Sequence, residues 1–195
     1  MDSREYFNSV ADKWDSMVYH DTDKINKIMS LIDLQKGSRV LDVGTGTGIL
    51  IPYISSIIGD NGSVTAIDIS DRMIDIAKSK YSYSNVNYIV GDVMEAELPL
   101  KNYDCIICYS MFPHLSEKGH AVKKFASLLK SEGKLVVCHS QSRESINNLH
   151  KEKDNTVKDD ILPEIFVLEG YYNEAGLKTV CVVDNDEMYV IIGER

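Results

Sequence analysis

Residues 40–50 read VLDVGTGTGIL, a short apolar run followed by glycine at every second position. Gly44, Gly46 and Gly48 lack side chains where we expect a strand to pass into a helix. Such a turn bends tightly and lets a ligand approach the backbone amides closely. The alternative is a turn that is merely tight, but Asp42, two residues before the first glycine, favours a binding site for a cation.

The spacing of these glycines argues against a dinucleotide. NAD-binding folds carry G-x-G-x-x-G, and the turn holds a pyrophosphate at the N-terminus of a helix. Here the spacing is G-x-G-x-G, and the carboxylate of Asp42 would repel a phosphate. The stretch therefore indicates a cationic ligand rather than NAD.

Strand and helix patterns alternate from Arg39 onward. Apolar runs predict strands over 39–43, 63–69, 86–92, 103–109, 134–139, 178–185 and 187–194. Helical spacing and caps predict helices over 2–17, 21–36, 48–58, 71–81, 117–130, 140–153 and 162–176, with a polar connection over 153–160. The pattern predicts an α/β fold, a doubly wound Rossmann-like seven-stranded sheet, mostly parallel with one antiparallel strand, with helices on both faces.

Acidic residues follow the first three predicted strands of this sheet. Asp42, Asp68 and Asp92 would meet at one edge, because the carboxyl ends of parallel strands lie together. Asp68 is placed to accept hydrogen bonds from both hydroxyls of a ribose, and Asp92 from the exocyclic amine of adenine. Helix capping or loop solvation explains each acid alone, but three in series favour a ligand site.

Several stretches in chain order resemble class I S-adenosylmethionine-dependent methyltransferases. They are VLDVGTGTGIL, VTAIDIS, YIVGDV, YDCIICYSMFPHL and LLKSEGKLVV, and the resemblance runs across about residues 20–195. The N-terminal YFNSVADKWDSMVYHD is similar to the small-molecule branch near the ubiquinone/menaquinone biosynthesis methyltransferases. SMFPHL replaces the glycine-rich segment of the quinone enzymes, so we assign no quinone acceptor.

The resemblance implies S-adenosylmethionine as the cofactor and assigns parts of its site. The turn Asp42–Gly48, with Thr45, would hold the methionine part. Asp68 would bind the ribose, and Ile69 would lie against the adenine.

Two further strand ends complete the implied cofactor site. Asp92 and Val93 would meet the adenine. The backbone around Cys108 and Tyr109 would face the methionine ammonium.

The resemblance also organises the chain as one methyltransferase domain over residues 1–195. Residues 1–36 would form a helical lid and residues 37–139 the cofactor-binding core. Residues 140–162 would be an inserted helix and loop, and residues 163–195 a C-terminal helix and strand pair.

Methyl transfer is an in-line displacement with an excellent leaving group, so proximity and alignment matter most. A general base is needed only if the acceptor arrives protonated. The catalytic candidates are Tyr19 and His20, which end the first helix, and His114 and His139, which follow strands. His114 or His139 is the predicted general base.

A divalent metal is a second hypothesis for the same histidines. His139, Glu144 and His150, joined by His114 or His20, are ligand types that bind such ions. The spacing H-x4-E-x5-H matches no standard zinc pattern. A polar lid helix with ordinary hydrogen bonds is the alternative.

Charge and composition restrict the partners. The formal net charge of -9 disfavours nucleic acid, and no stretch is long enough for a membrane span. No signal-like segment begins the chain, and four cysteines in apolar runs suggest reduced thiols in the cytoplasm. The CxxC pair Cys105 and Cys108 would face opposite sides of a strand, which argues against zinc or redox chemistry.

A small-molecule acceptor is the leading hypothesis. CYSMFP follows the fourth strand, in place of the NPPY-like tetrapeptide of enzymes that methylate adenine or glutamine. The alternatives are a methyltransferase of RNA or protein and a non-catalytic S-adenosylmethionine-binding module. The sequence leaves the oligomeric state open.

Overall fold

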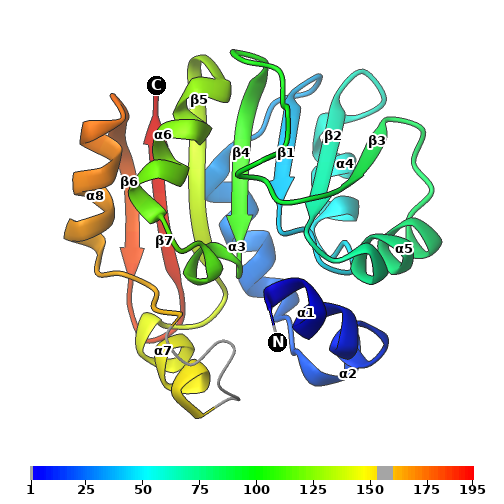
Figure 1. Cartoon of the computed structure of the whole chain (residues 1–195). Helices are drawn as coiled ribbons and strands as arrows, with labels where there is room; N and C mark the ends of the chain where they lie inside the picture. Colours follow the sequence, from blue (N-terminus) through cyan, green and yellow to red (C-terminus); the bar gives the residue numbers. More distant parts are fainter. Residues whose placement is uncertain (1, 153–159) are drawn as a thin grey trace.

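The computed structural model describes residues 2–152 and 160–195, and its centre is one seven-stranded sheet. The strands are β1 (Arg39–Val43), β2 (Ser63–Asp68), β3 (Val86–Val90), β4 (Tyr103–Tyr109), β5 (Leu129–His139), β6 (Lys178–Asp184) and β7 (Tyr189–Glu194). Their order across the sheet is β3-β2-β1-β4-β5-β7-β6 (Figure 1). Strand β7 runs antiparallel to both of its neighbours, and the other pairs are parallel. The predicted fold class is confirmed.

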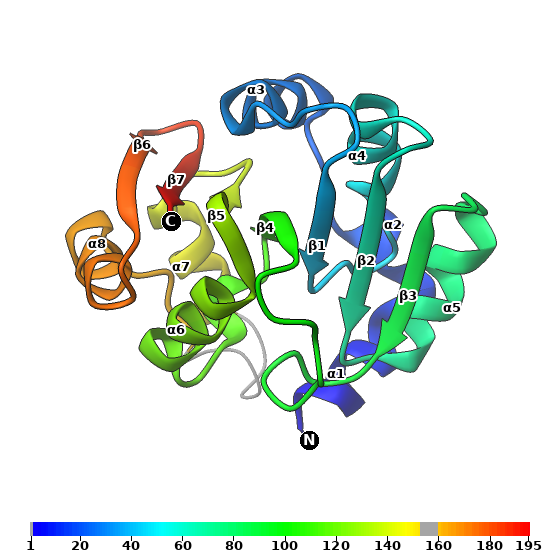
Figure 2. The same ribbon diagram turned by 90° about the horizontal axis from the view of Figure 1, so that it is seen from above.

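Helices cover both faces of the sheet. They are α1 (Ser3–Val10), α2 (Trp14–Met17), α3 (Thr22–Ile32), α4 (Ile51–Ile58), α5 (Asp71–Lys80), α6 (Lys118–Leu128), α7 (Arg143–Glu152) and α8 (Ile165–Glu174), with 3₁₀ turns η1 (Ala11–Lys13) and η2 (Phe112–His114). Figure 2 shows α3, α4 and α5 on one side of the sheet and α6 and α8 on the other. No helix in the described ranges is long and apolar enough to cross a membrane.

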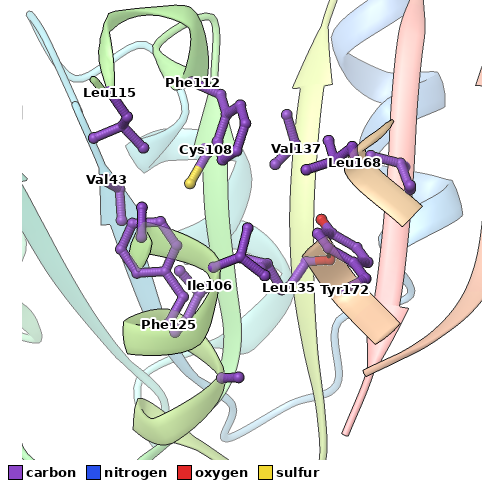
Figure 3. Close-up of a cluster of buried hydrophobic side chains, with 14 of the residues drawn as sticks. Val43, Ile106, Cys108, Phe112, Leu115, Phe125, Leu135, Val137, Leu168 and Tyr172 are labelled. Atoms are coloured by element: carbon purple, nitrogen blue, oxygen red, sulfur yellow. Dashed lines mark hydrogen bonds between the residues drawn. The ribbon is translucent and has the colours of Figure 1, made fainter. Parts of the chain in front are cut away.

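Each face of the sheet buries its own apolar cluster. One lies between the sheet and α6 and α8, where Cys108, Phe125 and Tyr172 meet (Figure 3). The other lies beneath α3 and α4 and contains Cys105. All four cysteines are free thiols. Cys105 and Cys108 face opposite sides of β4, as predicted, because alternate strand residues point to opposite faces.

Two helix ends differ from the prediction. The helix expected over 117–130 ends at Leu128, because Leu129 pairs with Tyr103 and begins β5. Gly133 therefore lies inside the strand instead of ending a helix. The helix expected to continue to Gly37 ends at Ile32, where Asp33 takes the left-handed conformation with φ 56°.

Local capping explains where the helices around the site begin. Asp2 and Glu5 form a reciprocal capping box on α1, as the sequence predicts. The Ser70 hydroxyl accepts from the Met73 amide and starts α5. Ser142 accepts from the Ser145 amide at the start of α7. Helices α1, α2 and α7 lie at the same end of the sheet (Figure 1).

The fold does not test two predictions about how the chain is divided into segments. The polar connection over 153–160 lies outside the described residues except for Asp160. The division into lid, core, insertion and C-terminal segments stays a prediction.

Candidate functional site

A cavity of about 460 Å³ lies at the carboxyl ends of the parallel strands, beneath α1, α2 and α7. Topology places it there, since ligands of open α/β sheets bind beyond the carboxyl ends of the strands. The predicted cofactor residues that line it are Asp42, Gly44, Thr45, Gly46, Asp68, Ile69, Asp92, Val93 and Tyr109. The structure therefore assembles most of the predicted set in one place.

The first two glycines of the turn face the cavity, and both have positive φ. A Cβ on Gly44 would lie 2.7 Å from the Cβ of Met111. Gly48 does not line the cavity, which corrects its prediction as a cofactor residue. A Cβ there would lie 3.0 Å from Ile51 Cδ1 and from Tyr81 Cδ2, so Gly48 permits packing between helices.

Asp42 is buried at the bottom of the cavity. Burial raises the pKa of its carboxyl to about 7, against a hydrogen bond from Thr45 that lowers it. Thr45 Oγ1 donates to Asp42 Oδ2 over 2.6 Å. A cation beside this carboxylate would favour its ionised form. The position suits the positive charge expected from the sequence.

Asp68 joins the glycine turn to the start of α5. Its Oδ2 accepts from the Gly46 amide at 2.8 Å, and its Oδ1 accepts from the Ser70 amide at 2.9 Å. Burial raises the pKa of this carboxyl although both hydrogen bonds oppose the shift. Each carboxylate oxygen has a second lone pair, so hydroxyl groups of a ligand can still donate to it.

Residues after β2 and β3 form the adjoining wall. Asp92 Oδ1 accepts from the Met94 amide at 2.8 Å and shapes the turn after β3. Val93 is buried, and Ile69 is half-buried. Apolar side chains beside a carboxylate match the requirements of an adenine ring; that they bind one stays a prediction.

The end of β4 contributes Tyr109 but not Cys108. The Cys108 side chain points into the apolar cluster under α6 (Figure 3) and does not line the cavity, and that the backbone around Cys108 and Tyr109 faces the methionine ammonium stays a prediction. Tyr109 alternates to the opposite side, and its hydroxyl lies 3.0 Å from His20 Nδ1 and 2.9 Å from Ser140 Oγ. Burial raises the pKa of Tyr109 to about 12.

The two catalytic candidates at the end of the first predicted helix, Tyr19 and His20, differ in whether they line the cavity. His20 lines the cavity, and burial lowers the pKa of its imidazole. Tyr19 is 83% exposed and lies outside the cavity lining, so its prediction as a catalytic residue is wrong. The chain is extended at Val18, after α2 ends, so consecutive side chains point in different directions.

Three imidazoles of the cavity lining lie near one another. His114 Nδ1 lies 2.5 Å from Asp160 Oδ2, and His150 Nδ1 lies 2.6 Å from the Asp160 backbone oxygen. The rings of His114 and His150 are 5.2 Å apart. His139 lines the cavity and is 1% exposed. Within the described chain neither of its ring nitrogens has a hydrogen-bond partner.

His139 is thus an unusual buried group. Burial lowers the pKa of its imidazole to about 3, and His114 and His150 reinforce the shift. The ring is neutral at physiological pH, with one nitrogen that accepts and one that donates. Leaving a buried polar group unpartnered costs about 1–3 kcal/mol. Such a group points to a ligand that supplies the missing partners.

The predicted metal set is not assembled. Glu144 is exposed and does not line the cavity, whereas His139 and His150 do. A spacing of six residues along α7 places Glu144 about 120° around the helix axis from His150. Over residues 2–152 and 160–195 no group of three or more His, Cys, Asp or Glu side chains is arranged to hold a metal ion. The metal hypothesis is therefore wrong for these residues.

Phe7 and Asp160 are cavity residues that were missed at the sequence level. Phe7 and Trp14 line the cavity, and their rings are 5.8 Å apart. Their spacing of seven residues, two helical turns, was the available signal. Asp160 had no such signal, because it lies in an irregular segment and reaches His114 only through tertiary packing.

Comparisons with known proteins agree with this architecture. Residues 40–133 match the family model described as "Methyltransferase domain". The malonyl-[acyl-carrier protein] O-methyltransferase of Acetivibrio thermocellus is 34% identical over 136 residues, 67% of this chain and 46% of that protein. The ubiquinone/menaquinone biosynthesis C-methyltransferase UbiE of Vibrio cholerae is 30% identical over 142 residues, 68% of this chain and 55% of that protein. The chain thus spans about half the length of these two curated relatives.

A solved structure extends the likeness to the whole fold. The SAM-dependent methyltransferase from Aquifex aeolicus superposes with a TM-score of 0.74 and covers 96% of this chain and 97% of its own. At 23% identity this likeness shows the fold alone.

Proposed function

This chain belongs to the class I S-adenosylmethionine-dependent methyltransferases, and we propose that it methylates a small-molecule acceptor by in-line transfer. The observation that carries the proposal is one cavity with two different halves. We use the name cofactor half for the three carboxyl groups and the glycine turn in its lining, and the name acceptor half for the imidazoles and apolar rings. S-adenosylmethionine, when bound, supplies a methyl group on a sulfonium, and catalysis then needs mainly alignment with the acceptor.

The residues of the first half fit this cofactor. The space beside Gly44 is one that a Cβ would fill, which suits close approach of a ligand to the backbone. Asp42 offers a carboxylate to the positive charge of the methionine part. Asp68 has lone pairs for the ribose hydroxyls, and Asp92 and Val93 offer a polar and an apolar contact to adenine.

The size and charge of the molecule support a small acceptor. The cavity volume falls in the range of small-molecule sites, and the net charge of -9 opposes a nucleic-acid substrate. The names of the curated relatives, an O-methyltransferase and a C-methyltransferase, leave the acceptor open. We also propose a cytoplasmic location, which the four free thiols support.

The cofactor assignment is tested by calorimetry with S-adenosylmethionine. We expect Asp68→Ala to lower the affinity about 10–100-fold, as for loss of charge-assisted hydrogen bonds. The control is Asp60→Ala, which removes an exposed acid away from the cavity and is expected to bind like the wild type. Unchanged affinity in Asp68→Ala would contradict the assignment.

The acceptor class is tested with methyl-labelled S-adenosylmethionine and a metabolite extract from the protein's own cells. Label in a small-molecule fraction supports the proposal and provides the product for identification. Label that stays with RNA or protein favours a macromolecular substrate. Cofactor binding without transfer to any fraction favours a non-catalytic binding module.

A further inference from the structure

The acceptor half of the cavity has a defined chemistry. Six residues form it: Phe7, His114, His139, Ile146, Leu149 and His150. Phe7 packs against His114 with ring centroids 5.2 Å apart. Apolar side chains and imidazole rings thus line the place where an acceptor would lie.

Permanent cations are missing from this lining. Among the described residues no lysine or arginine lines the cavity, whereas five acidic residues do. The Asp160 carboxylate beside His114 adds negative charge on the acceptor side. A phosphate or carboxylate on the acceptor would meet no lysine or arginine among the described lining residues, so this lining favours an uncharged acceptor over an anion.

The hydrogen bonds of the three imidazoles distinguish His139 from its neighbours. The Asp160 backbone oxygen only accepts, so His150 donates from Nδ1 to it. The Asp160 carboxylate holds His114 Nδ1 in the same way. Within the described ranges His139 has neither nitrogen engaged, although it is almost fully buried. A hydroxyl group that donates to the nitrogen without a hydrogen supplies one of the two partners that this ring lacks.

We propose that the acceptor is an uncharged molecule that bears a phenolic or enolic hydroxyl, and that His139 binds this hydroxyl and takes its proton. The proposal rests on the proposed function and assigns its acceptor side. It selects His139 because both of its ring nitrogens lack a partner in the described chain, whereas His114 already has a partner at Nδ1.

The step balances in atoms and charge. The acceptor oxygen forms a bond to the methyl carbon as the carbon–sulfur bond breaks, and the electron pair of that bond stays on sulfur. The hydroxyl proton passes to the free nitrogen of His139. The positive charge would move from the sulfonium to the imidazolium, so the net charge of the cavity with its two ligands would not change. Product release then lets the imidazolium lose its proton to water.

The test uses 4-methylphenol and its anionic match 4-methylbenzoate, with the wild-type protein saturated with S-adenosylhomocysteine. Ring ¹⁵N resonances of the histidines report which imidazole each probe contacts, and His139→Gln assigns the His139 signal. We expect 4-methylphenol to shift the His139 resonance and to bind at least about tenfold more tightly than 4-methylbenzoate. We expect the affinity of His139→Gln for 4-methylphenol to be about tenfold lower than that of the wild type, the value of one hydrogen bond. His120→Gln, an exposed histidine outside the cavity lining, is the control.

Each outcome decides a separate question. Tighter binding of 4-methylbenzoate, no binding of 4-methylphenol, or a shift confined to His114 and His150 overturns the acceptor assignment. Absence of S-adenosylhomocysteine binding in calorimetry contradicts the proposed function instead. The same titration of the ligand-free protein then still shows whether His139 contacts the phenol.

Discussion

At the scale of single residues, burial sets the protonation of the cavity. It raises the pKa of Asp42 to about 7 and lowers that of His139 to about 3. Both shifts favour the neutral form, as desolvation requires. The ligand-free cavity therefore carries less charge than its residue types suggest. A cationic ligand would reverse the effect at Asp42 by stabilising its carboxylate.

Asp42 predicts a specific pH dependence of stability. Its folded pKa lies above the ordinary value of about 3.8 for an aspartate, so the folded state binds the proton more tightly than the unfolded state does. The stabilising contribution is complete below about pH 4 and is lost as the pH rises to about 7, at about 1.4 kcal/mol per pKa unit. As the pH rises from about 4 to about 7, we expect the free energy of unfolding of Asp42→Asn to fall less than that of the wild type.

Urea denaturation at several pH values measures this difference. Other titrating groups, including His139 and Asp68, are common to both proteins, so the comparison isolates Asp42. Thr45 Oγ1 can donate to the side-chain oxygen of asparagine as well. Parallel pH profiles for the two proteins would show that Asp42 does not titrate in this interval.

At the scale of elements, close contact between α8 and β7 secures one face of the sheet. Tyr172 of α8 is fully buried, and its hydroxyl donates to the Leu135 backbone oxygen at 3.3 Å. A Cβ on Gly193 of β7 would lie 2.3 Å from Tyr172 Cδ2. The absence of a side chain at Gly193 thus allows the tyrosine ring to lie on the sheet.

Substitution of this glycine tests the contact. We expect Gly193→Ala to lower the free energy of unfolding by about 1–3 kcal/mol, the usual cost of overpacking. Gly170→Ala, in α8 with no neighbour within 4 Å of the new Cβ, is the matched control. It should be neutral or stabilising by up to about 1 kcal/mol. Equal stabilities of the two variants in urea denaturation would argue against a rigid contact.

At the scale of the whole molecule, the sheet and the helix α1 over the cavity, which we call the cover, differ in how deeply they are buried and in the contacts that hold them. Helix α1 has no buried residue and attaches to α5 through Asn8, which bonds Ser70 and Asp71. The ion pair of Arg72 with Asp12 is exposed, and such pairs contribute about 0–1 kcal/mol. In contrast β4 is almost wholly buried between two partner strands. The cover therefore opens more easily than the sheet.

Hydrogen exchange measures this difference directly. We expect amides of α1 to exchange by local opening, orders of magnitude faster than those of β4, which exchange only on global unfolding. S-adenosylhomocysteine should slow exchange in α1 more than in the distant β6. Equal protection of α1 and β4 in the ligand-free protein would contradict a weakly held cover.

The sequence by itself determined the fold and the cofactor half of the cavity. Alternating strand and helix patterns predict the sheet, and each carboxyl end is marked by a local signal such as the glycine turn, Asp68 or Asp92. These signals suffice because the carboxyl ends of parallel strands lie together in any sheet of this kind.

Only the tertiary structure decided the acceptor half and the directions of individual side chains. It shows that Tyr19, Gly48 and Glu144 lie outside the cavity lining. It also brought Asp160 to His114 and left His139 without a partner. These outcomes depend on how α7, η2 and the chain around Asp160 pack over the strand ends. Contacts between residues so distant in the chain have no periodicity in the sequence, which is why no local pattern predicts them.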